Sequence, residues 1–474
     1  MCSQVDLIRE VFHYQSRFES STMVFKIDYP VTEDPAFPGL MKDLALLAKT
    51  GFKVIIVPGA KENIDAVFNQ HNIETSYTST CDGEVRVTTS QAISYVEMAA
   101  FNVASRFMTF LSGSRVNALI GNFVRARGLG VINGIDTEHT GTVDKIYADS
   151  LKKVLDLGMI PILPCIGWSP SGKPYNVPSD EIALQVSSAL GAAKLYILTI
   201  HEGIKISNFE SCIESYLNEE NRASLMHRSL KIAHRNTIES LETRPDGSLV
   251  RLTPSQAELF IAAYNEYGQN EPDSDDKQQY LREIKLALNA CNAGVQRIHI
   301  IDGREEGAVL KELFSNLGVG TMVYTDEYDA VRVLHSKDLP DILRLMEPLM
   351  QNGLLVRRNP EQILEKKDDY YVLIIDGSIR ACGALHYWGE SQSEIAAIAT
   401  DPNYTDLGLG RKIVGFLIEK AKKLKMSRVF ALTTQSQDWF ESLGFKEVSV
   451  DSLPEQKRSV YDYNRGSKVF ALDL

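Results

Sequence analysis

The chain has 474 residues, which is too long for a single hydrophobic core, so two or three domains are expected. Its 44% hydrophobic and 24% charged content is typical of globular proteins. The formal net charge of −12 argues against a nucleic-acid-binding protein, because such a protein needs a basic face.

Cysteine spacing and the lengths of apolar runs argue against zinc-binding, disulfide-rich, secreted and membrane-spanning proteins. The six cysteines contain no C-x-x-C pair, so neither a zinc site nor a disulfide framework is expected. The N-terminal residues include Asp6, Arg9 and Glu10, which do not suit a signal peptide. The longest apolar run, Met159 to Trp168, is broken by two prolines, so we expect no membrane span and a cytoplasmic location.

Up to residue 328, short apolar strands alternate with helical stretches such as 39–50 and 179–190. The predicted strands are 23–27, 54–57, 116–120, 160–164, 195–199 and 297–301. Acidic residues open the helix at 179, and an acidic loop at 268–277 precedes a helix at 280–292. This order predicts an α/β fold with a mostly parallel sheet and helices on both faces.

The pattern changes after residue 323. The polar stretch 325–329 is typical of a linker, and a new strand at 331–334 is followed by a helix at 337–350. We therefore predict two domains, 1–328 and 329–474.

A glycine loop is the most informative feature of the second domain. An apolar strand, Ile395 to Ala399, is followed by a Pro-Asn turn and then by Gly408 and Gly410. An amphipathic helix follows with its apolar stripe at Ile413, Leu417, Ala421 and Leu424. Free amides and the positive end of the helix dipole at such a helix start favour a pyrophosphate site.

The elements after this loop resemble the GNAT acetyltransferase fold. A strand at 429–434 and the turn Trp439-Phe-Glu-Ser-Leu-Gly-Phe445 follow the helix. The family motif has Arg or Gln where this chain has Thr405, but the expected contacts are made by the main chain. The resemblance implies that acetyl-CoA, the only cofactor expected, is bound by Ile398, Ala399, Leu407, Gly408, Leu409, Gly410 and Arg411.

Over its whole length the chain resembles the bacterial N-acetylglutamate synthases, in which an amino-acid-kinase-like αβα domain precedes a GNAT α+β domain. The most specific motifs are 355–358, 432–434, 439–440 and 453–468 in the second domain, and 39–63, 176–182 and 312–321 in the first. The resemblance implies acetyl transfer to L-glutamate in the first step of arginine synthesis. It also implies L-arginine as an effector and a homo-oligomer, with hexamers known among relatives.

Two arginines suit a substrate that carries two carboxylates, because the planar guanidinium binds a carboxylate with two hydrogen bonds. Arg358 and Arg465 fall on the family's glutamate-binding positions, and Ser467 is expected to add a hydroxyl. Arg357 and Lys468 stay open as alternatives.

The resemblance places a general base at Glu394, because an ammonium group must lose a proton before it attacks a thioester. A backbone N–H near Ala397 and Ile398 would bind the oxyanion. Thr433 and Thr434 would contact the substrate or protonate the leaving thiolate. Strand alternation predicts Glu394, Ala396 and Ile398 on one face. No metal is expected, and His386 is interpreted as a loop or pocket-edge residue rather than as a ligand.

The first domain departs from acetylglutamate kinases at both glycine motifs. Lys26-Ile-Asp-Tyr29 replaces Lys-x-Gly-Gly, and Val57-Pro-Gly-Ala60 replaces His-Gly-Gly-Gly, so side chains occupy space that phosphates need. We expect no kinase activity there. The resemblance instead implies an L-arginine site at Tyr14, His299, Glu312 and Gly318.

Three other functions stay open at this point. One is a true bifunctional kinase and acetyltransferase, and another is an arginine sensor with an inactive acetyltransferase domain. The third is an acetyltransferase for protein lysines. Aspartate also stays open as the acceptor in place of glutamate, because the two differ by one methylene, which changes the binding free energy by only about 1–3 kcal/mol.

Overall fold

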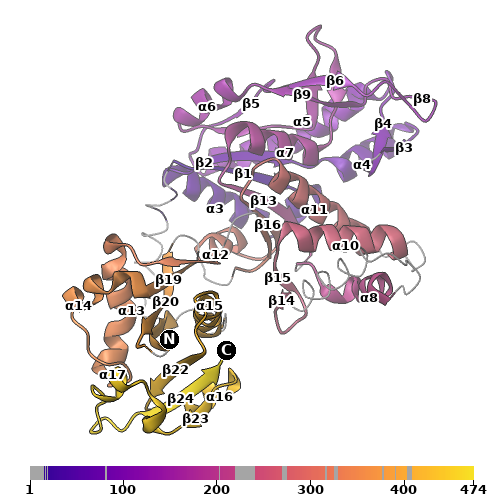
Figure 1. Ribbon diagram of the computed structural model, residues 1–474. Coiled ribbons are helices and arrows are strands. Elements are labelled where there is room, and N and C mark those ends of the chain that lie inside the picture. The colour runs from indigo at the N-terminus through magenta and orange to yellow at the C-terminus, as the bar shows by residue number, and fades with distance from the viewer. Residues whose placement is uncertain are drawn as a thin grey trace. The chain divides into compact units, whose positions relative to one another are not determined.

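The computed structural model describes residues 15, 18, 20–80, 83–201, 203–218, 241–268, 275–314, 318–324, 329–375, 378–389, 391–402 and 408–474. Its contacts divide the chain into two compact units, Met1–Asp326 and Glu327–Leu474. Each unit has its own main sheet (Figure 1). Each unit also has its own hydrophobic core. The domain boundary predicted after residue 328 falls beside residues 325–328, which lie outside the described part of the chain.

A nine-stranded sheet forms the centre of the first unit. Its order is β14 (Glu242–Thr243), β15 (Leu249–Leu252), β17 (Thr321–Tyr324), β16 (Arg297–Asp302), β13 (Lys194–Thr199), β1 (Thr22–Ile27), β2 (Lys53–Pro58), β10 (Ile160–Ile162) and β5 (Ala118–Ile120). Neighbouring strands are parallel except for β14 with β15 and β16 with β17. The predicted mostly parallel sheet is therefore confirmed.

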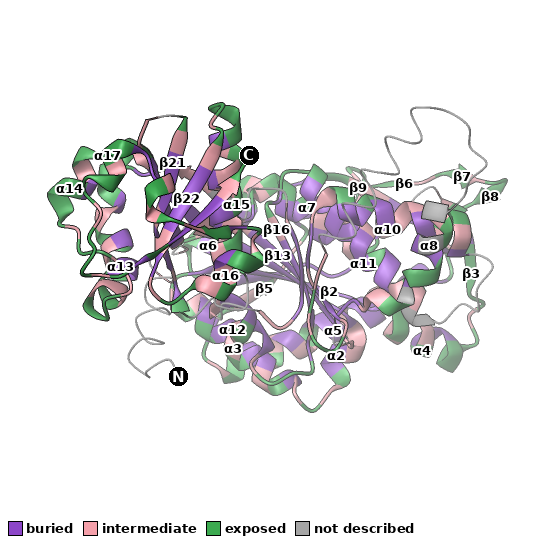
Figure 2. Cartoon of the chain, turned by 60° about the horizontal axis from the view of Figure 1, so that its bottom comes forward, coloured by how far each residue is buried: buried purple, intermediate pink, exposed green. Residues whose placement is uncertain are grey.

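Helices pack on both faces of this sheet, because its central strands are apolar at successive positions. Phe25 belongs to one core and its neighbour Val24 to the other. One core includes α3 (Phe37–Lys49), α4 (Lys61–His71), α5 (Ile93–Gly113) and α12 (Ala308–Phe314). The other includes α6 (Ala148–Asp156), α7 (Ser179–Leu190), α10 (Pro254–Tyr267) and α11 (Asp275–Asn292). Figure 2 shows β2 and β13 as buried between these layers, and β1 is buried as well.

Three small β-structures of the first unit were not predicted, and one of them pairs β7 (Val131–Ile132) with β8 (Ile135–Asp136). A hairpin joins β3 (Ser76–Thr80) to β4 (Gly83–Val87). A second sheet has the order β12 (Pro174–Asn176), β11 (Ile166–Trp168), β6 (Val124–Gly128) and β9 (Gly141–Ile146). These strands are short or polar, so their sequence carries little apolar alternation from which they could be recognised.

The second unit contains a seven-stranded sheet. Its order is β18 (Asp329–Val333), β19 (Tyr370–Ile375), β20 (Ser378–Tyr387), β21 (Gln392–Thr400), β22 (Arg428–Thr433), β24 (Lys468–Asp473) and β23 (Lys446–Val448). On one face, α13 (Leu339–Gln351) and α14 (Pro360–Glu365) pack against it. On the other face pack α15 (Leu409–Lys423) and α16 (Gln437–Ser442).

Candidate functional site

The strands β21 and β22 separate shortly after they begin to pair. Their parallel pairing covers only Gln392–Glu394 with Arg428–Phe430. Beyond that point β21 pairs with β20, and β22 pairs with β24. One backbone edge of residues 395–400 therefore has no strand partner among the described residues. Such an edge offers amides and carbonyls to an extended ligand that itself carries amide groups.

A β-bulge interrupts β21 at Ala397. Ala397 has a φ of 53°, and the register with β20 shifts opposite Cys382 and Ala384. Ile395 and Ile398 pack on the α15 side, whereas Ala397 and Ala399 pack on the α13 side. The predicted alternation was therefore wrong, because the extra residue of a bulge reverses the facing of all later positions. Glu394 and Ile398 lie on opposite faces.

The two glycines of the loop serve different purposes. Gly408 caps the start of α15 with a φ of 59°, a conformation that favours glycine, and no side chain caps this helix start. Gly410 is small for packing, because a Cβ there would lie 3.1 Å from Cζ2 of Trp439. The first turn of α15, including Leu409 and the exposed Arg411, thus leaves amides available for an anion. Thr405 and Leu407 lie outside the described residues.

Glu394 is buried rather than solvated. Its carboxylate oxygen Oε2 accepts hydrogen bonds from Trp388 Nε1 at 2.8 Å and from Lys457 Nζ at 2.7 Å. Only 8% of the Glu394 side chain is exposed. A carboxylate this deeply buried needs such partners, because an uncompensated charge would be costly.

The two candidate substrate arginines are linked by one chain segment. Arg465 Nη2 donates to the carbonyl oxygens of Gly353 at 3.1 Å and Leu354 at 3.0 Å, at the start of the segment that leads to Arg358. Arg358 is half-buried and acts electrostatically on Tyr370, Cys382 and His386. No carboxylate among the described residues forms an ion pair with Arg358. Its guanidinium charge is therefore available to a ligand.

The remaining acceptor candidates lie on and beside β22 and β24. Ser467 is buried, and its carbonyl oxygen accepts a hydrogen bond from the Tyr461 hydroxyl. Thr433 Oγ1 accepts from the amides of Ser436 at 2.9 Å and Gln435 at 3.3 Å, so it shapes the start of α16. Thr434 follows directly after β22 and is partly exposed. These contacts give Thr433 a structural role whether or not it also contacts a substrate.

His386 lies in a buried strand beside the candidate base, and not in a loop. It lies directly opposite Glu394 in the pairing of β20 with β21 and is 8% exposed. Its Nδ1 lies 2.8 Å from Asp369 Oδ2. Burial lowers the pKa of His386, although the hydrogen bond to Asp369 and the charge of Glu394 oppose this shift. The only sequence signal for this position was the register of two strands, which the sequence alone did not supply.

In the first unit, the lysine that remains of the kinase-like motif, Lys26, is neutralised by carboxylates of the same unit. Lys26 Nζ lies 2.5 Å from Asp28 Oδ1 and 2.8 Å from Asp180 Oδ1. Arg282 adds a second cation 3.4 Å from Asp180. Burial alone would lower the pKa of Lys26, but the charges of Asp180 and Asp28 raise it. Burial alone would raise the pKa of Asp180, but Lys26 and Arg282 hold it at about 2.

Three of the four predicted arginine-site residues lie together. His299 Nδ1 lies 2.6 Å from Glu312 Oε1, and a Cβ on Gly318 would meet Glu312 Oε2 at 2.6 Å. The amides of Val319 and Gly320 donate to Oε2 at 2.6 and 3.1 Å. The fourth residue, Tyr14, lies outside the described residues.

The ionisation states of this pair follow from burial and hydrogen bonding. Burial alone would raise the pKa of Glu312, but the hydrogen bond and charge of His299 and the two amide bonds hold it at about 2. Burial, together with the charge of Lys194, lowers the pKa of His299 even though Glu312 opposes the shift. At neutral pH the pair is therefore a carboxylate beside a neutral imidazole.

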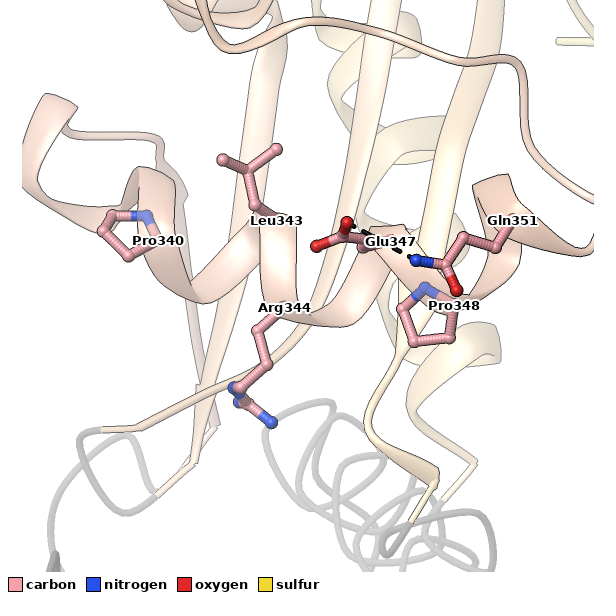
Figure 3. Close-up of a pocket in the computed structure, with 6 residues that line it drawn as sticks. All are labelled: Pro340, Leu343, Arg344, Glu347, Pro348 and Gln351. Atoms are coloured by element: carbon pink, nitrogen blue, oxygen red, sulfur yellow. Dashed lines mark hydrogen bonds between the residues drawn. The ribbon is translucent and has the colours of Figure 1, made fainter.

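A groove on the surface of α13 is unrelated to these residues. It is lined by Pro340, Leu343, Arg344, Glu347, Pro348 and Gln351 (Figure 3). These positions form the outward stripe of the helix, whereas Ile342, Leu345 and Met346 face the core. None of the predicted site residues lines this groove.

The described residues contain neither a membrane-spanning helix nor a metal-binding cluster. No described helix is long and apolar enough to cross a membrane. In the same part of the chain, no cluster of three or more His, Cys, Asp and Glu side chains is arranged to hold a metal ion.

Comparison with known proteins gives two family matches. Residues 31–227 match the amino acid kinase family, and residues 338–445 match the acetyltransferase (GNAT) family. The predicted fold class is thereby confirmed.

Similar proteins extend over the whole chain. The amino-acid acetyltransferase of Vibrio vulnificus is 32% identical over 476 residues, which cover 98% of this chain and 97% of that protein. The amino-acid acetyltransferase of Escherichia coli K12 is 30% identical over 481 residues, covering 99% and 98%. N-acetylglutamate synthase from Neisseria gonorrhoeae, complexed with coenzyme A and L-arginine, matches with a TM-score of 0.80 and 29% identity, covering 100% and 99%. A second structure of that enzyme, with coenzyme A and N-acetyl-glutamate, matches with a TM-score of 0.58, 30% identity and the same coverage.

Proposed function

Because the chain belongs to the amino-acid acetyltransferase family, we propose that it acetylates the α-amine of L-glutamate and that L-arginine regulates it from the first unit. The chain is an acyltransferase, as predicted, and acetyl-CoA is its co-substrate. The observation that carries the choice of acceptor is the guanidinium of Arg358, which pairs with no carboxylate among the described residues and acts on Tyr370 together with the buried carboxylate of Glu394.

In this proposal the donor lies along the unpaired edge of β21. The amides and carbonyls of residues 395–400, including Ile398 and Ala399, would bond to the amide groups of the pantetheine arm. The free amides at the start of α15, from Gly408 to Arg411, would hold the pyrophosphate. Both sets of contacts are made by the main chain, so the departure at Thr405 does not remove them.

The acceptor would be held by its two carboxylates. Arg358 binds one of them, and Arg465 with the Ser467 hydroxyl binds the other. Arg465 uses Nη2 to hold the carbonyls of Gly353 and Leu354, so its remaining guanidinium N–H groups serve the ligand. One side chain would thus bind the substrate and fix the segment that carries Arg358.

The chemical step needs one proton acceptor and one oxyanion site. Glu394 would take a proton from the ammonium group, directly or through water, and the amine nitrogen would attack the thioester carbonyl carbon. The amide N–H near Ala397, which the bulge turns out of the regular ladder, would stabilise the oxyanion. The C–S bond then breaks, and the second proton that the attacking nitrogen loses as the amide forms would pass through the Thr434 hydroxyl to the thiolate.

The effector would bind near Glu312. A carboxylate accepts about four hydrogen bonds, and His299, Val319 and Gly320 already supply three to Glu312. One acceptor position is thus left for a guanidinium group, next to the loop that begins at Gly318. We include Tyr14 on the resemblance alone, and we include assembly into a homo-oligomer, which light scattering would test.

The test is release of free thiol from acetyl-CoA with L-glutamate, L-aspartate, L-ornithine or no acceptor, each with and without L-arginine. We expect thiol release that depends on glutamate and changes with arginine. Coenzyme A binding without turnover for any acceptor would reject the enzymatic proposal in favour of a sensor. Unchanged rate and thermal stability at millimolar arginine would reject the effector proposal alone.

A further inference from the structure

Lys457 lies 63 residues from Glu394 in the sequence, but its ammonium group contacts the candidate base. It belongs to the short helix α17 (Glu455–Arg458), which lies inside the tail motif 453–468, but the motif gave Lys457 itself no role in the reaction. We propose that Lys457 and Trp388 are positioning residues that orient the Glu394 carboxylate for proton transfer. This inference rests on the proposed function, in which Glu394 is the base.

Both contacts fall on the same carboxylate oxygen. Lys457 Nζ and Trp388 Nε1 donate to Oε2 of Glu394, at 2.7 and 2.8 Å. The described residues supply no hydrogen bond to the other oxygen, Oε1. The donors therefore prevent the carboxylate from turning and leave Oε1 as the oxygen that can receive a proton.

Lys457 is itself held in place. Its ammonium lies 4.6 Å from the centre of the Trp388 ring, and only 14% of its side chain is exposed. A cation beside an aromatic face is attracted by the ring, most strongly where water is excluded. The indole thus contacts Glu394 with its edge and Lys457 with its face. This arrangement of three side chains is more rigid than a surface ion pair.

Removal of the ammonium has a predictable electrostatic effect. A buried carboxylate without a neighbouring cation favours its protonated form, and a protonated carboxyl group cannot act as a base. Other groups around Glu394 modify but do not replace this contribution. They are His386 on β20 with its partner Asp369, Arg358, Tyr370 on β19, and Lys366, which lies 5.9 Å from the Trp388 ring.

The experiment is a pH profile of kcat/KM for glutamate with Lys457→Met, Lys457→Arg and Trp388→Phe. We expect Lys457→Met to lower kcat roughly 10- to 100-fold, no more than the lower end of what general bases contribute, and to move the acid-side fall in rate to higher pH. Lys457→Arg should restore most of the rate and the wild-type acid limb. Trp388→Phe keeps a ring but loses the donor, so its effect should be smaller and in the same direction. Lys422→Met removes an exposed ion pair with Glu419 and serves as the control.

The outcomes separate this inference from the proposed function. If Glu394→Gln keeps the wild-type rate, Glu394 is not the base and both proposals fail at this site. If Glu394→Gln is inactive but Lys457→Met keeps the wild-type rate and acid limb, the positioning role alone is rejected. A loss of rate with an unmoved acid limb in Lys457→Met, or no rescue by Lys457→Arg, would show a merely structural role. If Lys457→Met does not fold, Trp388→Phe decides in the same way.

Discussion

Two basic residues, one in each unit, differ in what surrounds their charge. Lys26 in the first unit is 1% exposed and contacts two carboxylates, Asp28 and Asp180. Arg358 in the second unit is half-buried and has no carboxylate partner among the described residues. The difference teaches that a cation reserved for a ligand is recognised by the absence of an internal counter-ion.

This difference bears on the chemistry that each unit can support. Phosphoryl transfer is catalysed mainly by positive groups that remain free to stabilise the charge of phosphates. In the first unit, Asp28 neutralises Lys26 at a position where the kinases resembled by this chain have glycine. This network supports the interpretation that the first unit has no kinase activity. The second unit leaves its guanidinium for a carboxylate substrate.

The largest expected effect comes from removal of the unpaired charge. Arg358→Met should lower kcat/KM for glutamate about 100- to 1000-fold, because a charge-assisted bond to a substrate carboxylate is lost. The KM for acetyl-CoA should change little. The neighbouring exposed arginine provides the control, Arg357→Met, which should stay close to wild type. An equal loss for both substrates would mean that Arg358 supports the fold rather than the acceptor.

Removal of a counter-ion in the first unit should lower the stability of the fold and leave acetyl transfer unchanged, which is the reverse of the effect expected for Arg358→Met. Asp28→Ala leaves Lys26 buried with one carboxylate fewer and should lower the free energy of unfolding by about 3 kcal/mol. Acetyl transfer per folded molecule should persist. Asp156→Ala, which breaks the exposed pair with Lys53, should cost less than about 1 kcal/mol. Urea unfolding checks both variants, and equal costs would remove the basis of the comparison.

Acid should lower the free energy of unfolding of the first unit, because its buried carboxylates become protonated. The pKa of Asp180 and the pKa of Glu312 are both held at about 2, below the ordinary values near 4. Their stabilisation is complete above the ordinary values and is lost as the pH falls through about 2. For Asp180 this loss should amount to roughly 2 kcal/mol. The free energy of unfolding measured at pH 5, 4, 3 and 2.5 should fall less steeply in Asp180→Asn than in Asp156→Asn.

The smallest effect on kcat and stability is expected at Ala397, where the proposed oxyanion donor is a main-chain amide. Ala397 has a φ of 53°, so Ala397→Gly should relieve strain and change the free energy of unfolding by less than about 1 kcal/mol. Because the proposed oxyanion donor is an amide, kcat should change less than in Arg358→Met. Thiol release and urea unfolding provide the measurements. A loss of kcat as large as that of Arg358→Met would contradict a main-chain role.

Local pattern was sufficient for much of the fold. The helix 179–190 was predicted with the bounds of α7, and the six predicted strands of the first unit all correspond to strands of one sheet. Apolar runs of one strand or helix identify such elements because burial acts on each of them directly. The combination of an amino-acid-kinase-like domain with a GNAT domain was predicted from longer motifs, and the two family matches confirm it. The residue assignments at the sites stay predictions.

Tertiary structure decided what depends on contacts between distant segments. The bulge at Ala397 overturned the predicted alternation, and strand register placed His386 opposite Glu394. The resemblance predicted a base at Glu394, but only folding brought Lys457 against it from 63 positions away. Thus the sequence by itself determined the kinds of element, their order and the chemical groups present. Only the folded chain determined which of those groups neutralise one another, because electrostatic interactions depend on distance and burial rather than on separation along the chain.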